Sequence, residues 1–327
     1  MQWHRRLHYP CGVDYRVGTM GFGYPDWNGT FYPRGLTGPD RLAFYAKHFD
    51  AIELDSTYHA IPAVEAVDAW RDATPPGFLF TAKMSKAVTH SGVPLTGAGS
   101  RSQTLLWLDT LTRLGEKLAC CLIQFPASFA PHPHNLAGLD VYLHTLPAGV
   151  RYAVEFRHDG WWTRDTADLL KSLNVSWVVA DEAPHPVVAG DGEGYEPRRA
   201  VLTGDLFYAR FIGVHEQFEK KTHQRLDPAG RLGWWAERLR KLEGTRVTRT
   251  LCFFNNDYAG HSPDTARQMR RALGLPELSP PVSLFADWPL VPPHPCSACG
   301  PAAGGTARMR WHRASLRFPP WTRRRCS

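Results

Sequence analysis

The sequence predicts an α/β protein that folds as a single (β/α)8 barrel, the TIM barrel, followed by a disordered extension rich in proline and arginine. Short apolar runs alternate with amphipathic stretches eight times between Tyr15 and Leu275. The roughly 260 residues involved fit a barrel, which typically needs about 250. An open dinucleotide-binding sheet is disfavoured, because Gly18, Gly21 and Gly23 lack the spacing of its phosphate-binding turn.

The expected strands are short and rich in β-branched or aromatic residues, which suit a pleated and half-buried surface. None of them is long enough to be mistaken for a membrane span. In chain order they cover residues 15–19, 51–54, 78–83, 120–125, 152–156, 176–180, 206–211 and 250–255.

Helical periodicity fills most of the intervals between these strands. Pro39 and Asp40 open one helical segment, and Leu105, Leu108 and Leu111 form the apolar stripe of another. Segments 228–242 and 262–273 continue the pattern. Residues 182–204 are the exception. They are rich in proline, glycine and charge, and they predict a long loop.

Three segments are predicted along the chain: an N-terminal extension at residues 1–14, the barrel at 15–275, and a disordered basic tail at 276–327. The tail is predicted because prolines are dense after Pro276 and hydrophobic periodicity ends there. It contains one Cys-x-x-Cys pair, Cys296 and Cys299. This pair is weak evidence for zinc, because no second pair and no histidine at finger spacing accompany it.

The composition is that of a globular protein, with 43% hydrophobic and 21% charged residues in a chain of 327. The apolar runs are far shorter than the roughly 20 residues that cross a bilayer, so no membrane partner is expected. The basic residues 1–11 precede no apolar core of about 7 to 15 residues, so a cytoplasmic location is predicted. Cys120, Cys121 and Cys252 lie in apolar runs, where we expect free buried thiols.

The formal charge of +7 is not spread over the whole chain. Seven arginines lie after Trp288, where no lysine or acidic residue occurs. Without them the 38 basic residues fall to 31, which equals the number of acidic residues. The body of the protein therefore carries no general positive field of the kind that attracts nucleic acid.

Polar residues gather at the predicted carboxyl ends of the strands, where a (β/α)8 barrel carries its active site. Period-2 alternation places Glu53 and Asp55 on one face of the second strand, and Glu155 and Arg157 on one face of the fifth. The candidates from these strand ends are Glu53, Asp55, Lys83, Gln124, Glu155, Arg157, His158, Asp181, Arg210, Asn255 and Asn256.

Charged groups at strand ends are costly to bury unless they are paired or bind a ligand. On the functional interpretation, Lys83, Arg157 and Arg210 hold an anionic group. The candidate catalytic residues are then Glu53, Glu155 and Asp181, with the two glutamates as acid and base. On the structural interpretation, the same charges neutralise one another in a salt-bridge network that closes the mouth of the barrel.

Aromatic residues are a second feature of the strand-end loops. Trp27 lies among several aromatic residues in the first loop, and Tyr58 follows the second strand. Both are candidates to stack on a substrate ring, and the alternative is that the first loop simply packs over the barrel. His90 follows the third strand, and His158 and His261 are also available, but none of these three histidines pairs with another at the helical spacing of metal ligands. The cofactor is therefore left open, no metal ligand is assigned, and a divalent metal is not favoured.

A series of motifs resembles the YecE-like proteins, catalogued as domain of unknown function 72, in the order found in that family. They are Val17-Gly18-Thr19, Tyr24-Pro25-Asp26-Trp27, FDAIELDSTYH at 49–59, Gln124-Phe125-Pro126, AVEFRH at 153–158 and FFNNDYAGHSP at 253–263. The resemblance covers residues 15–275 and implies a (β/α)8 barrel, but it supplies no activity. The barrel is also broadly similar to those of apurinic-site endonucleases and sugar isomerases.

The chain departs from the family pattern at three positions. The family often has Trp at Phe22, Asn at Asp55, and Ser or Cys at Met20. Asp55 therefore adds a carboxylate where the family supplies an amide, which changes the charge of the predicted site. The arginine-rich tail is foreign to the family.

The leading hypothesis is an enzyme, either a hydrolase or a lyase or isomerase, that acts on a small anionic substrate, phosphorylated or sugar-derived. One alternative is metal-dependent phosphodiesterase or endonuclease-like cleavage of nucleic acid through Glu53, Glu155, Asp181 and a histidine. The other is a non-catalytic module that binds a nucleotide or nucleic acid. Weak nucleic-acid binding is also expected of the arginine-rich tail.

Overall fold

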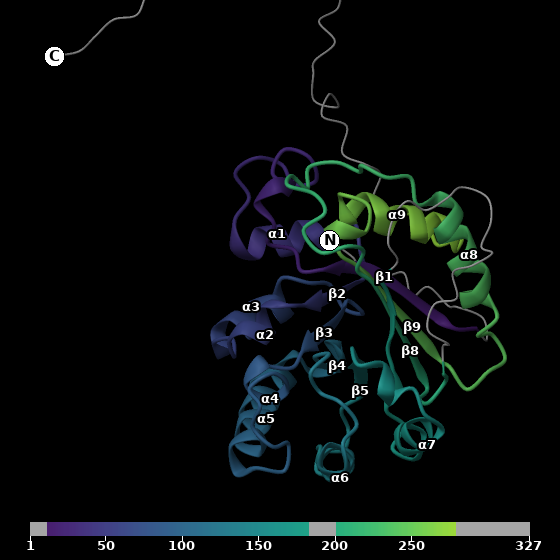
Figure 1. Ribbon diagram of the computed structural model, residues 1–327. Coiled ribbons are helices and arrows are strands. Elements are labelled where there is room, and N and C mark those ends of the chain that lie inside the picture. The colour runs from purple at the N-terminus through teal and green to yellow at the C-terminus, as the bar shows by residue number, and fades with distance from the viewer. Residues whose placement is uncertain (1–11, 183–200, 279–327) are drawn as a thin grey trace, which may run out of the picture. The chain divides into compact units, whose positions relative to one another are not determined.

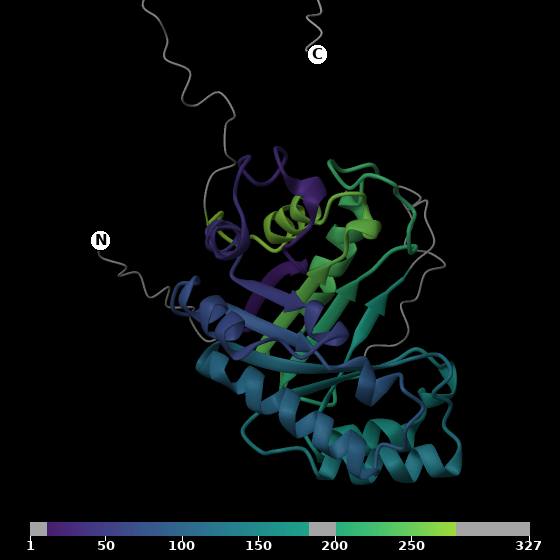
Figure 2. The same ribbon diagram turned by 90° about the vertical axis from the view of Figure 1, so that its left-hand side faces the viewer.

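The computed structural model describes residues 12–182 and 201–278 and confirms the predicted barrel. Its strands form one sheet in which all recorded pairs are parallel, in the order β6-β5-β4-β3-β2-β1-β9-β8-β7. The views in Figures 1 and 2 show helices lying around this sheet. Part of the predicted long loop, at 183–200, lies outside the described residues, as do residues 1–11, 279–327 and the Cys296 and Cys299 pair.

Every predicted strand is present, with ends that differ by at most two residues. The bounds are β1 Asp14–Met20, β2 Ala51–Leu54, β3 Leu79–Lys83, β4 Leu118–Phe125, β5 Tyr152–Phe156, β6 Ser176–Trp177, β7 Val179–Asp181, β8 Leu206–Phe211 and β9 Arg249–Phe254.

The sixth predicted strand is divided into β6 and β7, and this division closes the barrel. β6 pairs with β5, whereas β7 pairs with β8. Val178 lies between them, and its N–H donates to the Val154 carbonyl of β5 (2.9 Å). The Ser176 hydroxyl of β6 donates to the Leu206 carbonyl of β8 (2.7 Å). The chain thus changes its main hydrogen-bonding neighbour within a few residues, and the two edges of the sheet meet at this point.

The helices connect successive strands, and several begin at clear signals in the sequence. Pro263 is in the first turn of α9, and the Thr163 hydroxyl accepts from the Thr166 N–H at the start of α7 (3.2 Å). The α-helices are α1 Gly38–Tyr45, α2 Ser56–His59, α3 Val64–Asp72, α4 Lys86–Thr89, α5 Ala98–Leu111, α6 Pro133–His144, α7 Arg164–Ser172, α8 Ala229–Arg240 and α9 Ser262–Ala272. Short 3-10 helices are η1 Pro25–Trp27, η2 Thr112–Lys117, η3 Asp159–Trp161 and η4 Asn256–Tyr258.

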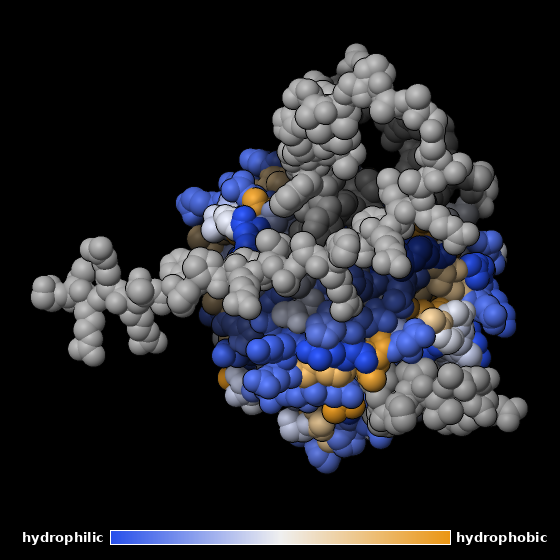
Figure 3. Space-filling model, turned by 90° about the horizontal axis from the view of Figure 1, so that it is seen from above, coloured by the Kyte–Doolittle hydropathy of each residue, from blue (hydrophilic) through white to orange (hydrophobic). Residues whose placement is uncertain are grey.

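Two apolar clusters make up the core. The larger one includes Leu42, Leu139 and Leu232 and lies between the strands and the helices. The smaller one lies on the opposite face of the strands, inside the barrel, and includes Leu79 and Leu251. Figure 3 shows that hydrophilic residues cover most of the coloured surface seen from above. The inner cluster fills the barrel below the carboxyl ends of the strands. Polar groups can therefore occupy those ends.

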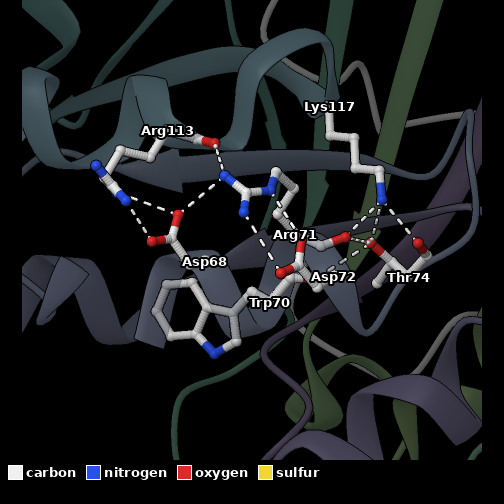
Figure 4. Close-up of polar contacts among 7 residues, drawn as sticks. All are labelled: Asp68, Trp70, Arg71, Asp72, Thr74, Arg113 and Lys117. Carbon is white, nitrogen blue, oxygen red and sulfur yellow. Dashed lines mark hydrogen bonds and ion pairs between the residues drawn. The ribbon is translucent and has the colours of Figure 1, made fainter. Parts of the chain in front are cut away.

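A polar network fastens the end of α3 near the start of β4 (Figure 4). Lys117 donates to the carbonyl oxygen of Arg71 in the last turn of α3 (2.6 Å) and to that of Thr74 just beyond the helix (2.7 Å). Arg71 and Arg113 both contact Asp68. A lysine at the carboxyl end of a helix satisfies free carbonyls and opposes the helix dipole. This end of the barrel lies opposite the strand carboxyl ends and serves stability.

The three candidate free cysteines behave as predicted. Cys120, Cys121 and Cys252 are buried and unpaired. Burial raises the pKa of the Cys252 thiol to about 12, which keeps it an inert hydrophobe. Separately, in residues 12–182 and 201–278 no helix has the length and apolar character needed to span a membrane.

Candidate functional site at the strand carboxyl ends

Arg210 on β8 is the centre of an ionic network at the carboxyl ends of the strands. Its Nη2 lies 2.7 Å from Glu53 Oε1, and its Nε lies 3.1 Å from Glu53 Oε2. Its Nη1 donates to Glu155 Oε2 (2.8 Å). The Arg210 side chain is only 4% exposed, and Glu53 is fully buried. One guanidinium therefore holds carboxylates from β2 and β5 out of contact with solvent.

Hydroxyl groups extend this network towards the inner apolar cluster. Tyr208, two residues before Arg210 on the same strand face, donates to Glu53 Oε2 (2.6 Å). Its oxygen also lies 2.8 Å from the Thr81 hydroxyl on β3. Sequence reasoning missed Tyr208 and Thr81, although the alternation that selected Arg210 also places Tyr208 on its face. Every oxygen of Glu53 thus has a partner, as a buried carboxylate requires.

The outer layer of the site is open to solvent. Arg157 Nε lies 2.5 Å from Glu155 Oε1, and its Nη1 contacts Glu182. Asp55 Oδ1 lies 3.7 Å from Arg210 Nη2. The side chains of Arg157 and Asp55 are 26% and 32% exposed. A ligand at the mouth would therefore meet Arg157 and Asp55 before it met Arg210.

Lys83 is placed differently from the two arginines. Its Nζ lies 4.2 Å from the centre of the Tyr58 ring, at the distance of a cation–π contact. The His90 ring packs edge-on against the same Tyr58 ring, with the centroids 5.0 Å apart. Among the described residues, no carboxylate oxygen lies within 4 Å of Lys83 Nζ. The sequence places His90 after the third strand, but only the structure shows that it contacts Tyr58.

The two glutamates that share Arg210 have pKa values displaced in opposite directions. Burial and the nearby Asp55 raise the pKa of Glu53 to about 7, against the opposing effect of Arg210. Burial also acts to raise the pKa of Glu155, but the charges of Arg157 and Arg210 outweigh it and lower the value to about 2. Environments that separate the pKa values of neighbouring carboxyls are typical of acid–base sites.

Asp181, a predicted catalytic residue, does not join this group. It accepts from Arg231 Nε (2.7 Å) and Trp235 Nε1 (2.8 Å), both on α8. Trp235 belongs to the outer apolar cluster, so the Asp181 side chain points away from the barrel interior. Side chains alternate along a strand, and Asp181 falls on the opposite face from Glu53 and Glu155. Its contacts fasten α8 to β7.

Trp27 and Asn256, predicted to bind substrate, are both fully buried. Trp27 Nε1 donates to Asn256 Oδ1 (3.1 Å), which also accepts from the Ser262 N–H (3.0 Å). Phe31 and Tyr32 pack against the Trp27 ring. These contacts join the first loop to the start of α9 and leave neither side chain open to a ligand. The structure thus favours the packing interpretation of the first loop.

Three further candidates lie at the strand ends and make local backbone contacts. Gln124 on β4 is opposite Glu155 in the β4–β5 register, and its Nε2 donates to the Phe125 carbonyl (3.1 Å). His158 Nδ1 accepts from the Gly160 N–H (3.0 Å), and Asn255 Oδ1 accepts from the Asp257 N–H (3.0 Å). These two residues cap η3 and η4, which fixes the loops around the site.

The described part of the chain contains no group of three or more His, Cys, Asp or Glu side chains that could hold a metal ion. The carboxylates that meet at the mouth contact guanidinium groups instead.

A parallel barrel with ionisable side chains at its strand carboxyl ends defines the class to which this protein belongs, the (β/α)8 barrels. Within that class, the chain belongs to the family described as "Protein of unknown function DUF72", whose model matches residues 16–284. This agrees with the resemblance found in the motifs.

Two bacterial relatives and a solved structure agree with this assignment. The chain is 29% identical to UPF0759 protein YecE of Escherichia coli (strain K12) over 217 residues, which are 61% of this chain and 76% of YecE. It is 25% identical to UPF0759 protein YunF of Bacillus subtilis (strain 168), covering 79% of this chain and 94% of YunF. A crystal structure of a DUF72 family protein from Thermotoga maritima MSB8 is similar, with a TM-score of 0.65 and 30% identity. That match covers 80% of this chain and 99% of the other.

Proposed function

We propose that this protein is an enzyme that binds a small anionic substrate, phosphorylated or sugar-derived, at the carboxyl ends of its strands. The observation that carries the proposal is the presence of Lys83 at the mouth without a carboxylate partner among the described residues, beside the partly exposed Arg157. A buried or half-buried cation needs a counter-charge, and a ligand can supply it. Hydrolase and lyase or isomerase chemistry both suit such a site.

Arg210 has a different role from the one predicted from sequence. Its Nε, Nη1 and Nη2 are all bonded to Glu53 or Glu155, and the side chain is nearly inaccessible. It therefore acts as a positioning residue that sets the two glutamates in place. In this proposal Lys83 and Arg157, which lie nearer to solvent, bind the anion in place of Arg210.

Asp55 and Glu53 also have different roles in this proposal. Asp55 is partly exposed and can touch a substrate held by Lys83 and Arg157. Glu53 is the group whose pKa, near 7, suits proton transfer at neutral pH. Because Glu53 is covered in this structure, its acid–base role requires Arg210 to move when substrate binds. The metal-dependent alternative has no observation in its favour among the residues described.

Thermal melting in the presence of inorganic phosphate tests the proposal. A ligand at about 100 times its dissociation constant stabilises a protein by about 2.7 kcal/mol, which is a measurable rise in Tm. We expect Lys83→Met and Arg157→Met to lose this rise. Lys86→Met and Arg164→Met, which remove exposed cations nearby in the sequence, should retain it.

The melting temperature without phosphate provides the control for folding. A variant whose unliganded Tm is unchanged and whose phosphate shift is lost supports the assignment. If the double variant of Lys83 and Arg157 keeps the full shift, the anion binds elsewhere and the proposal is wrong.

A further inference from the structure

We propose that the Lys83 amine is a covalent nucleophile that forms an imine with the carbonyl carbon of a small aldehyde or ketone. This inference rests on the proposed function for the location of the site, and it deepens it by naming a carbonyl group in the substrate. The unprotonated amine attacks the carbonyl carbon to give a carbinolamine, which loses water to leave the C=N bond. No oxidant or reductant is needed, because one amine and one carbonyl become one imine and one water.

The contacts of Lys83 distinguish it from the other cations of the site. Arg157 and Arg210 each bond carboxylates, at 2.5 Å and 2.7 Å. Lys83 Nζ makes no hydrogen bond or ion pair within the described chain and lies against the Tyr58 ring instead. A lysine that only neutralised charge would be expected to pair with one of the three carboxylates whose charges act on it, Asp55, Glu53 and Glu155.

The surroundings of Lys83 favour the neutral amine. Burial, and then the positive charge of Arg210, lower the pKa of Lys83, while Asp55, Glu53 and Glu155 act in the opposite direction. Burial and a neighbouring cation are the two conditions that activate lysine nucleophiles. Besides positioning the two glutamates, Arg210 thus favours the unprotonated amine of Lys83.

Groups that could move protons during imine formation lie beside the amine. His90 packs on the Tyr58 ring, and its Nδ1 lies 2.7 Å from the Thr89 hydroxyl. Burial and the charges of Lys83 and Arg157 lower the pKa of His90, which favours the neutral form of the ring. Asp55 lies at the solvent side of the same mouth. Loss of water from a carbinolamine needs such a proton donor and acceptor.

Reductive trapping tests the inference on the full-length protein. The probes are glyceraldehyde 3-phosphate and its neutral analogue glyceraldehyde, each with sodium cyanoborohydride, which reduces an imine to a stable secondary amine. Peptide mass mapping then locates the adduct. We expect labelling of Lys83 to exceed that of the exposed Lys86, because burial and Arg210 lower the pKa of Lys83 and favour its free amine.

Two variants separate chemistry from folding. Lys83→Arg keeps the positive charge but has no nucleophilic amine, so it should keep the unliganded melting temperature of the parent and lose the adduct. Lys86→Met should retain both the melting temperature and the adduct. Labelling of Lys83 no greater than that of Lys86 would show that the adduct is non-specific and would overturn the inference.

The two probes separate this inference from the proposed function. Stronger labelling by the phosphorylated aldehyde supports both the imine and the anion site. Equal labelling of Lys83 by both aldehydes supports the imine and contradicts anion binding. Loss of labelling at Lys83 with an intact phosphate shift in the melting temperature overturns the imine and leaves the anion site standing.

Discussion

Arg210 and Glu53 are 157 positions apart in the sequence, yet three contacts of 2.7 to 3.2 Å join their side chains. They lie on β8 and β2, which are separated in the sheet by β9 and β1. Both are buried, so the pair bonds two distant strands in the interior of the barrel. Burying both charges costs desolvation free energy. Removing one partner costs more, because the remaining buried charge then has no counter-charge.

The first prediction concerns this pair. Arg210→Met should lower the free energy of unfolding by about 3 to 5 kcal/mol, because it leaves Glu53 and Glu155 without their shared cation. Chemical denaturation at pH 7 measures the loss. Neutralising the carboxylates as well, in Glu53→Gln, Glu155→Gln, Arg210→Met, should recover part of the stability.

The combined variant is the decisive comparison. Residues of one network are not additive, so a triple variant more stable than Arg210→Met alone indicates that unpaired charge caused the loss. A triple variant that is less stable than Arg210→Met would mean that packing, not electrostatics, dominates at this position.

The second prediction uses the opposite pKa displacements of the two glutamates. The pKa of Glu155 is lowered from 4.5 to about 2, so its ion pairs stabilise the fold above pH 4.5 and are lost as the pH falls towards 2. That contribution is about 3 kcal/mol at neutral pH. Glu155→Gln should therefore melt earlier at pH 7 and lose less stability than the parent between pH 4.5 and 2.

Glu53 should show the reverse dependence. Its pKa is raised from 4.5 to about 7, so the native state binds a proton more tightly than the unfolded chain, and stability falls as the pH rises from 4.5 to 7. Glu53→Gln should remove that decline. Melting temperatures at pH 2.5, 4.5 and 7 are the measurement, and parallel pH profiles for the two variants would contradict the opposite shifts.

Alternation along strands was sufficient to predict which residues share a face. It paired Glu53 with Asp55 and Glu155 with Arg157, and the structure brings these residues to one network with Arg210. The division of the sixth strand at Val178 was not predictable, because it depends on which neighbouring strands complete the barrel. A local pattern carries no information about pairings between residues distant in the sequence.

Burial was harder to predict than position. The aromatic first loop suggested either a stacking surface or a packed loop, and only the tertiary contacts of Trp27 with Asn256 decide between them. Likewise Asp181 is the last residue of β7, at the expected end of the barrel, but its side chain binds Arg231 and Trp235 on α8. In both cases the deciding partner lies more than 45 positions away, beyond the range of any periodicity.

The third prediction tests the opposite end of the barrel. Lys117 donates to two backbone carbonyls and to the Thr74 hydroxyl after α3, as Figure 4 shows. Lys117→Met should lower the free energy of unfolding by about 1 to 3 kcal/mol, since it leaves these acceptors without a donor. The phosphate-dependent shift in Tm should not change. Lys171→Met, an exposed lysine on α7, is the matched control and should be nearly neutral.

The last prediction concerns the arginine-rich tail, whose charge separates it from the rest of the chain. Seven arginines with a single acidic residue after Leu278 should bind polyanions weakly and with a steep salt dependence, because each phosphate contact releases counterions. If about four arginines contact DNA phosphates, affinity should fall on the order of 100-fold between about 50 and 200 mM salt.

A chain that ends at Leu278 is the appropriate comparison for that tail. Arg270 donates to the Pro276 carbonyl (3.0 Å), and Arg271 lies 3.7 Å from Glu277, so truncation before these residues would disturb α9. The shortened protein should melt as the full chain does and lose most DNA binding in a gel-shift titration at low salt. If it binds DNA as tightly as the full chain, the cations at the barrel mouth are responsible. The variants Lys83→Met and Arg157→Met should then abolish that binding, and a nucleic-acid substrate would replace the small anion proposed for this site.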